Sequence, residues 1–400
     1  PTSVMETGYD IIFFWVARMM MLGLFCTGVE PFHTIYLHGL VRADGGVKMS
    51  KTKGNVVDPL EIIDEIGADA LRYALTVGTS PGADQRLTMG KLDGARNFTN
   101  KLWNAARFVL GAQPELQVAP SGEPTLPERW IRSRLAEATE RATRQLDELE
   151  LSGYAGAIHE FAWSDYCDWY LEAVKVDLRR PAATDGDRAR AWETAAETLA
   201  SLLRLLHPVI PFVTEEIWLA LHEAAPQATG GEPLLISAAW PLPGARDRSA
   251  EADMATLTEL VRAVRNLRTE SGVAAVTWLP LTVVPADDAA RATIEGGVAY
   301  LEALARVRPI ELRDTGDDRG RQTGVASTPA AAAWAGSDPA ADERTSAARS
   351  ESEAHLRRGI ARLRTLLSGE FTERAPTEVV QRERNRLADL EAELRHLVGD

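Results

Sequence analysis

Three lysines lie within six residues of one another in the segment 48–55, in a chain whose formal net charge is −14. Ammonium groups at this spacing can bind a polyanion such as a nucleoside triphosphate, because the flexible Lys side chain follows phosphates as they separate. Turn-forming residues 43–46 precede the lysines, and Asp58 followed by Pro59 is typical of a helix start. The pattern therefore predicts a basic loop between a strand and a helix. This loop either binds phosphate or is a solvated basic turn.

The order of residues in this loop narrows the choice. The string Lys48-Met49-Ser50-Lys51-Thr52 resembles the second signature of class I aminoacyl-tRNA synthetases, in which a Ser usually follows the second Lys. Thr52 keeps the hydroxyl group at that position. The resemblance implies an ATP site in which Lys48 and Lys51 are catalytic, because cations placed to meet charge developing on the phosphates accelerate the reaction. It also implies that Met49, Ser50 and Lys51 bind ATP.

An apolar segment upstream, residues 8–19, carries a single carboxylate, Asp10, and a single Arg. Its composition predicts a helix that is apolar on all sides and therefore buried. A buried Asp10 needs a cationic partner such as the ammonium of an amino acid, or it is the helix N-cap. Pattern alone would make Ile11 and Trp15 core residues. The segment resembles the part of valyl-tRNA synthetases that lines the amino-acid pocket, which implies that Asp10, Ile11 and Trp15 contact valine.

Residues 34–41 have the β-branched and apolar content of a buried strand. Open α/β sheets bind their ligands at the carboxyl ends of such strands. His38 and Gly39 lie at that end, and in the synthetase family the corresponding His-Gly pair lies beside ATP. Both residues are therefore candidates for nucleotide contact, although a single His after a strand is more often structural.

Composition restricts the class of protein. The 400 residues, 45% of them hydrophobic, suggest about two to four domains. Cys26 and Cys167 are far apart and belong to no metal-binding motif, so we expect no disulfide, no zinc site and a reducing, cytoplasmic location. The apolar run from Ile11 to Leu24 is short and interrupted by Arg18, so we expect no membrane span.

The acidic net charge argues against indiscriminate nucleic-acid binding, so contact with RNA requires local basic patches. In the helical string 96–108, one stripe is apolar and the other carries amides and cations. Arginines also recur at 129–144, 262–268 and 382–386, where a solvated helix face is the alternative. The candidates for tRNA contact are Asn97, Lys101, Arg107, Arg132 and Arg382.

Two further strings, 168–172 and 207–218, resemble the helical anticodon-binding domain shared by the valine, isoleucine, leucine and methionine synthetases. Residues 278–312 read as strand, helix and strand, and the Ala-, Gly- and Ser-rich stretch 314–350 is expected to be disordered. The tail has apolar residues at helical spacing on both sides of 368–379, which predicts an antiparallel hairpin. It resembles the coiled-coil arm that ends valyl-tRNA synthetases and contacts tRNA.

The resemblance implies a multidomain fold. Its expected parts are the C-terminal part of a Rossmann-like α/β catalytic domain (1–90), a connecting helix and linker (91–127), an all-α anticodon-binding bundle (128–275), a small α/β appendage (276–313), a disordered linker (314–350) and a coiled-coil tRNA-binding arm (351–400).

The activity implied by the resemblance is valine–tRNA ligation. ATP, with Mg²⁺ bound to it, would activate valine to valyl-adenylate, and the valyl group would pass to tRNA(Val). The sequence begins at Pro1 inside a family motif, so we expect a monomeric fragment that is inactive alone. An isoleucyl- or leucyl-type synthetase and a non-catalytic tRNA-binding module are the alternatives.

Overall fold

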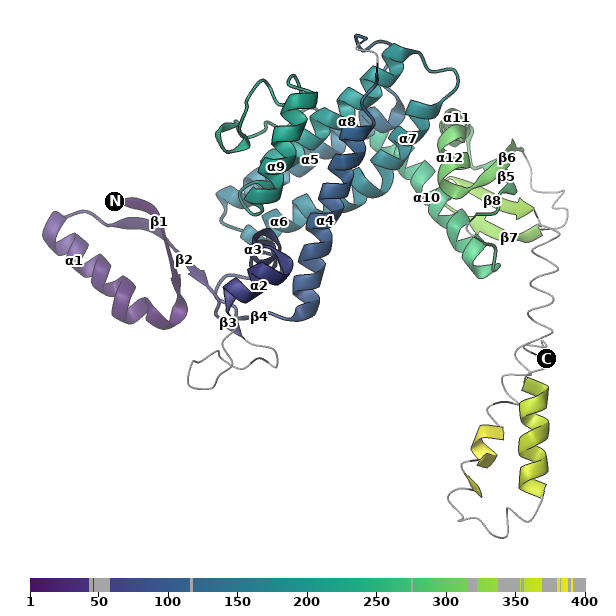
Figure 1. Cartoon of the computed structure of the whole chain (residues 1–400), viewed down its shortest axis with the longest axis horizontal. Coiled ribbons are helices and arrows are strands. Elements are labelled where there is room, and N and C mark those ends of the chain that lie inside the picture. The colour runs from purple at the N-terminus through teal and green to yellow at the C-terminus, as the bar shows by residue number, and fades with distance from the viewer. Residues whose placement is uncertain are drawn as a thin grey trace. The chain divides into compact units, whose positions relative to one another are not determined.

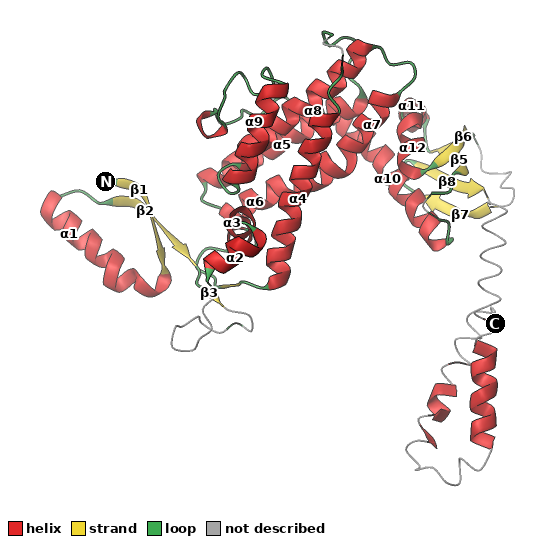
Figure 2. Ribbon diagram, viewed as in Figure 1, coloured by secondary structure: helices red, strands yellow, loops and turns green. Residues whose placement is uncertain are grey.

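The computed structural model describes residues 1–42, 46, 58–115, 118–274, 276–314, 322–336, 353, 356–368, 380–381, 383–387 and 390. The chain divides into two units, Pro1–Thr258 and Glu259–Asp400. Figure 1 labels the helices and strands of both units, and Figure 2 colours them by type. The first unit contains a parallel α/β segment and a helical bundle, and the second contains a small sheet with its helices.

The first unit begins with two parallel strands, β1 (Thr2–Gly8) and β2 (Phe32–His38). Strand β2 ends at the His that the sequence places at a strand end, whereas β1 was not predicted. The expectation that this strand is buried is wrong, because in β2 only Phe32 is buried. A two-stranded sheet with one connecting helix offers too little surface to cover both faces.

The connection between these strands is helical from Tyr9 to Thr27. It starts as a 3-10 helix, η1 (Tyr9–Ile11), continues as a π-helix, η2 (Ile12–Val16), and becomes α-helical in α1 (Ala17–Thr27). The expectation of a buried helix is wrong: Phe13 is 79% and Phe25 is 88% exposed, while Val16 is fully buried. Apolar composition predicts that a helix needs cover, and does not supply the elements that cover it.

The same stretch corrects a second expectation, that no segment is long enough to span a membrane. Tyr9–Thr27 is 19 residues long with a mean hydropathy of 1.6, which suffices by length and composition alone. The apolar run extends beyond the Ile11–Leu24 segment considered in the sequence, and one Arg does not lower its average enough to exclude it. A helix of this kind is weak evidence for a membrane protein, because core helices of soluble proteins have the same composition.

A second parallel pair, β3 (Val41–Arg42) and β4 (Gln85–Arg86), flanks the helices α2 (Pro59–Ile66) and α3 (Ala68–Thr76). The predicted helix start is confirmed, since the Asp58 carboxylate accepts a hydrogen bond from the N–H of Leu60 at 2.9 Å and Pro59 is the first helical residue. The long helix α4 (Met89–Gly111) then leads into the bundle.

The helical bundle contains the largest buried side chains of the chain. Its elements are α5 (Leu126–Asp147), α6 (Leu151–Glu160), the π-helix η4 (Phe161–Tyr170), α7 (Leu171–Arg179), α8 (Asp185–Leu206), α9 (Pro211–Ala224), the 3-10 helix η5 (Leu235–Ser237) and α10 (Arg248–Glu270). The predicted apolar stripe of α4 is confirmed, because Phe98, Leu102, Ala106 and Val109 are all buried. The indole N–H of Trp192 in α8 donates to the carbonyl of Val109 at 2.8 Å, which joins α8 to the end of α4.

Asp69 ties α3 to the start of α9. Its carboxylate accepts hydrogen bonds from the backbone N–H groups of Phe212 (3.3 Å) and Val213 (2.6 Å). One turn later, Arg72 donates to the carbonyl of Val209 at 2.9 Å. Burial raises the pKa of Asp69, and the two backbone hydrogen bonds oppose that rise by favouring the carboxylate. The side chain of Asp69 therefore caps a helix far from it in the sequence.

Replacing Asp69 with alanine should lower the free energy of unfolding of the first unit by about 1–2 kcal/mol, the usual cost of removing a helix cap. Two N–H groups of α9 lose their acceptor in a partly buried setting. Urea unfolding followed by far-UV circular dichroism measures the loss. Exposed Asp64 in α2 provides the control, and Asp64→Ala should change stability by less than about 0.5 kcal/mol. Equal losses in the two variants would contradict the capping role.

The second unit contains a four-stranded sheet in the order β6-β5-β8-β7. Its elements beyond α10 are β5 (Leu279–Pro285), α11 (Asp288–Gly296), α12 (Val298–Ala305), β6 (Val307–Leu312), β7 (Gln322–Ser327) and β8 (Ala331–Gly336). Strands β5 and β6 are parallel, and β8 pairs antiparallel with both β5 and β7. Strand, helix and strand thus lie where the sequence predicts them, with the helix divided at Gly297.

The expectation of disorder across 314–350 is wrong for β7 and β8. Ala331, Ala333 and Ala335 alternate along β8 and are buried, which is the period-two pattern of a strand with a packed face. Small side chains carry little hydrophobic weight, so composition hid this alternation. Residues 315–321 and 337–350 lie outside the described residues.

Parts of the C-terminal hairpin are described. Residues 356–368 are helical, and Leu356, Ile360 and Leu363 are buried. The Leu390 side chain lies next to Gly359 of this helix, since a Cβ added to Gly359 would be 3.4 Å from it. The contact brings the two predicted arms together at this point. The hairpin as a whole stays a prediction, because residues 369–379 are outside the described part of the chain.

Candidate functional site

The carboxyl ends of β1 and β2 bring together two residues that the sequence assigns to different substrates. Gly8 pairs with His38 across the strands. A Cβ added to Gly8 would lie 2.8 Å from the Asp10 carboxylate and 3.5 Å from the His38 ring. Asp10, expected at the amino-acid pocket, and His38, expected beside ATP, therefore lie on opposite sides of one glycine. Ligands of open α/β sheets bind at this position.

Asp10 is exposed in the structure, so its predicted burial is wrong. The residue that precedes the helix is Gly8, without a side-chain cap, and Asp10 lies inside η1. The N-cap alternative is therefore wrong as well. The Nε2 atom of His38 lies 3.9 Å from the carboxylate of Glu6 on the neighbouring strand, and its Nδ1 lies 3.0 Å from the carbonyl oxygen of Gly39.

Gly39 is required by a close approach of two chain segments. A Cβ at this position would lie 1.6 Å from the carbonyl oxygen of Ala83 and 2.8 Å from the amide nitrogen of Asp84. Beside it, the N–H of Gly82 donates to the carbonyl of Leu37 at 2.7 Å. The segment after β2 thus packs directly against the turn before β4. This contact gives Gly39 a structural role that does not depend on a nucleotide.

Asp84 organises the segment that leads to the lysine loop. Its carboxylate accepts hydrogen bonds from the N–H of Leu40 at 2.8 Å, the Nε of Arg42 at 2.5 Å and the hydroxyl of Tyr9 at 3.2 Å. The Leu40 hydrogen bond and the Arg42 ion pair hold the pKa of Asp84 below its ordinary value. One carboxylate therefore links the end of β1, the start of β3 and the turn before β4.

The lysine loop itself is not described. Lys48, Met49, Ser50 and Lys51 lie outside the described residues, and so does Arg382. The described flanks are Arg42, at the end of β3, and Asp58, at the N-cap of α2. The loop therefore joins a strand and a helix as expected, and both of its ends are held by hydrogen bonds.

Ile11 and Trp15 do not share the face of one regular helix. Ile11 belongs to η1 and Trp15 to η2, and both side chains are exposed. The guanidinium of Arg18 lies 5.0 Å from the Trp15 ring centroid, a cation–π contact. The valine contacts expected of Ile11 and Trp15 stay a prediction.

The candidates for RNA contact in the bundle have different surroundings. Lys101 lies 2.5 Å from the Asp168 carboxylate and 3.7 Å from the centroid of the Trp163 ring. Arg132 pairs with Glu197 at 3.1 Å. Asn97 and Arg107 are exposed on α4. The interdomain bracing considered as an alternative in the sequence fits Lys101 well, whereas Arg107 is open to a ligand.

The two strings typical of an anticodon-binding domain build the bundle. Trp169 and Tyr170 are buried in η4. Thr214, also buried, lies 2.9 Å from the Nδ1 of His207. The Glu215 carboxylate accepts hydrogen bonds from the N–H groups that begin η5, the first at 2.9 Å. These side chains fix the start of α9 and the loop that follows it.

Sequence reasoning missed Tyr9, Arg42 and Asp84. Residue 84 was recognised only as part of a turn, and nothing in the spacing of the three residues indicates that they meet. Cys26 and Cys167 are free, and burial raises the pKa of the Cys167 thiol to about 12, which makes it a poor nucleophile. Among the described residues, no group of three or more His, Cys, Asp or Glu side chains is placed to hold a metal ion.

Comparison with protein families matches residues 1–88 to the family described as tRNA synthetases class I (I, L, M and V). Residues 128–283 match the anticodon-binding domain of tRNA ligase. These matches support a class I catalytic segment followed by a mostly helical anticodon-binding domain. The domain boundaries expected from the sequence stay a prediction.

Individual relatives agree with this result. The chain is 44% identical over 319 residues to the valine–tRNA ligase of Dehalococcoides mccartyi (strain CBDB1), covering 78% of this chain and 35% of that protein. It is 41% identical over 392 residues to a valine–tRNA ligase of Thermus thermophilus, covering 97% of this chain and 42% of that protein. The chain thus spans less than half the length of both relatives. A structure of Mycobacterium tuberculosis methionyl-tRNA synthetase bound by methionyl-adenylate gives 23% identity and a TM-score of 0.49 over 62% of this chain and 50% of that chain.

Proposed function

Because this chain belongs to the class I tRNA synthetases, we propose that the protein carrying it is a valine–tRNA ligase. The observation that supports this most is the 41% identity to a valine–tRNA ligase across 97% of the chain. ATP, entering with its Mg²⁺, and valine would form valyl-adenylate, and tRNA(Val) would accept the valyl group. This chain would supply part of the catalytic site and the anticodon-binding domain.

In the first step, the valine carboxylate attacks the α-phosphate and pyrophosphate leaves. Lys48 and Lys51 would stabilise the charge that develops on the phosphates, with Ser50 and Met49 beside the nucleotide. Arg42, Asp84 and the capped helix α2 hold the two ends of this loop, so the cations start from fixed anchors. His38 would lie at the edge of the nucleotide site, at the end of β2.

On the amino-acid side, Asp10 would bind the valine ammonium, which is a natural partner for a single carboxylate in an apolar segment. Ile11 and Trp15 would form the wall against the valine side chain. Their exposure in the described residues fits a site that other parts of the catalytic domain complete. The same reasoning applies to Phe13 and Phe25, because exposed aromatic rings of this size normally pack against another surface.

Pyrophosphate exchange on the intact protein that carries this sequence tests the proposal. Valine should support exchange, and isoleucine should support it about 10- to 200-fold less well, the range that an apolar pocket achieves by one methylene group. The ratio of kcat/KM values measures this preference. Faster exchange with isoleucine than with valine would transfer the protein to the isoleucine enzymes. No exchange with any amino acid would favour the tRNA-binding module.

A further inference from the structure

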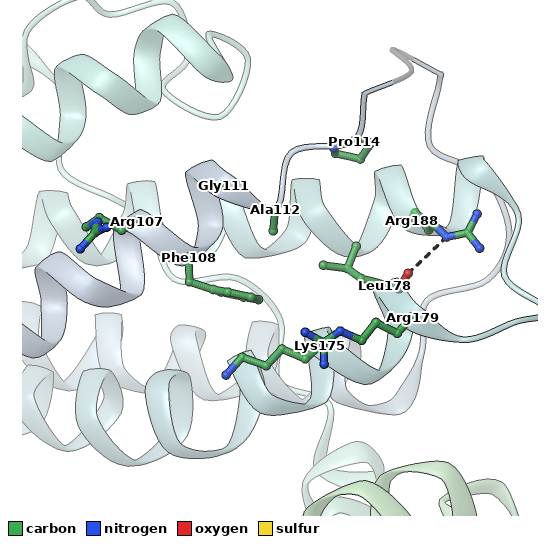
Figure 3. A pocket seen from close by; sticks show the side chains of 9 residues that line it. All are labelled: Arg107, Phe108, Gly111, Ala112, Pro114, Lys175, Leu178, Arg179 and Arg188. Atoms are coloured by element: carbon green, nitrogen blue, oxygen red, sulfur yellow. Dashed lines mark hydrogen bonds between the residues drawn. The ribbon is translucent and has the colours of Figure 1, made fainter.

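A basic pocket lies in the helical bundle, away from the catalytic segment. It forms where the ends of α4 and α7 meet the start of α8, and its volume is about 490 Å³. Figure 3 shows the residues that line it, which are Arg107, Phe108, Gly111, Ala112, Pro114, Lys175, Leu178, Arg179 and Arg188. We call it the α4–α7–α8 pocket.

The charge of this pocket is positive throughout. Arg107, Lys175, Arg179 and Arg188 line it, and no acid is among the lining residues. In a chain of net charge −14, four cations around one cavity form a local exception. Repulsion among like charges is unfavourable unless an anion or acidic side chain offsets it. The pocket is therefore a candidate anion site.

Acidic partners account for only two of the four cations. Lys175 pairs with Glu172 at 2.5 Å and Arg188 with Asp185 at 3.0 Å. Within the part of the chain that the structure describes, Arg107 and Arg179 have no carboxylate within ion-pair distance, and both are exposed. These two guanidinium groups can each donate several hydrogen bonds to a phosphate in a planar geometry.

The arrangement is partly preorganised. The Nε of Arg188 donates to the carbonyl of Leu178 at 3.2 Å, which fixes one cation at the pocket wall, as the dashed line in Figure 3 shows. The Lys175 ammonium lies 5.2 Å from the Phe108 ring centroid. Phe108, Leu178 and Pro114 add an apolar surface between the cations. A phosphodiester with its attached ribose fits this combination better than a free inorganic ion does.

A purely structural reading explains part of the pattern. Cations near the C-terminal ends of helices are stabilised by the helix dipole, and Arg107 and Arg179 are close to the ends of α4 and α7. Arg188 does not fit this reading, because it lies one turn from the N-terminal end of α8, where an acid would be favoured. The cations converge on one cavity from ends of opposite polarity.

We propose that the α4–α7–α8 pocket binds a phosphate of the RNA backbone through Arg107 and Arg179. The proposal rests on the proposed function, since it takes tRNA as the source of the phosphate. It assigns Arg107 a specific role and adds Arg179, which the sequence did not indicate. A backbone contact positions the RNA and carries no sequence information.

The test measures binding of fluorescent tRNA(Val) and of a non-cognate tRNA to the chain as salt is raised from about 50 to about 300 mM. The Arg107→Ala/Arg179→Ala double variant should bind both RNAs about tenfold more weakly, with a salt slope reduced by about one. The Arg107→Lys/Arg179→Lys variant, which keeps both charges, should retain most of the salt slope. Arg96→Ala is the control, because Arg96 lies on the same helix, is part-exposed and pairs with Asp93.

The outcomes separate the pocket from the proposed function. Failure of the unaltered chain to bind either tRNA would overturn tRNA binding and the pocket together. Unchanged affinity and salt slope in the double alanine variant, with normal binding by the unaltered chain, would overturn the pocket alone. A loss confined to tRNA(Val) would indicate base reading and contradict a backbone contact. Inorganic phosphate that binds the chain as tightly as tRNA does, and is lost in the double variant, would replace RNA as the ligand.

Discussion

Lys51→Ala, made in the intact protein that carries this sequence, should lower the rate of valine-dependent pyrophosphate exchange by about 10²–10³-fold, the effect of removing one preorganised electrostatic contact. The reason is that Lys51 occupies the second lysine position of the signature-like string. A cation there would meet charge on the phosphates more strongly in the transition state than in bound ATP. The change should therefore appear in kcat more than in KM.

Lys53 gives the matched control for this experiment. It lies in the same loop, two residues from Lys51, and carries the same charge, so Lys53→Ala changes the local field by a similar amount. We expect the rate to fall by less than about threefold, since a contact outside the reacting centre contributes little to catalysis. Equal losses in the two variants would show that net charge of the loop matters and that Lys51 has no specific place. An undiminished rate in Lys51→Ala would remove its catalytic assignment.

Much of the site could be predicted from the sequence because its parts lie close together along the chain. The end of β2 at His38, the start of α2 at Asp58 and the core stripe of α4 all depend on local spacing and capping chemistry. Such signals act within a few residues, so one sequence contains them completely. The order of these elements then indicated a catalytic segment followed by a helical domain.

Burial was harder to predict, and the N-terminal helix shows why. Its apolar residues correctly indicate that Tyr9–Thr27 is helical, but Phe13 and Phe25 are exposed. Whether a side chain is covered depends on neighbouring elements, which hydropathy along one segment cannot describe. The opposite error occurred in β8, where alternating alanines are buried in a stretch whose composition suggested disorder.

The contacts around Asp84 mark a second limit. Tyr9, Arg42 and Asp84 are joined by hydrogen bonds although 75 positions separate the first from the last. No pattern in the sequence connects them, because their meeting depends on how β3 and β4 pair. The same holds for Asp69 and the start of α9. Long-range polar contacts of this kind became visible only in three dimensions.

Gly39→Ala should destabilise the first unit by about 3 kcal/mol, at the upper end of the cost of overpacking a site. The new Cβ would lie 1.6 Å from the carbonyl oxygen of Ala83, so one of the two backbones must move. Movement would break the hydrogen bonds from Gly82 to Leu37 and from Leu40 to Asp84. Urea unfolding of the chain measures the loss, and pyrophosphate exchange in the intact protein should fall with it, because Asp84 also anchors the start of the lysine loop.

Gly94 makes this prediction a sharp one. It lies inside α4 with no atom within 4 Å of the position its Cβ would occupy, so Gly94→Ala should stabilise the chain by about 0.5–1 kcal/mol through helix propensity. The two substitutions are chemically identical and opposite in expected sign. If Gly39→Ala folds with unchanged stability, the segment after β2 does not pack against the 80–84 turn. If its stability is unchanged but exchange is lost, the role of Gly39 is contact with the nucleotide, as the sequence resemblance implies, and the close backbone approach is not what requires a glycine.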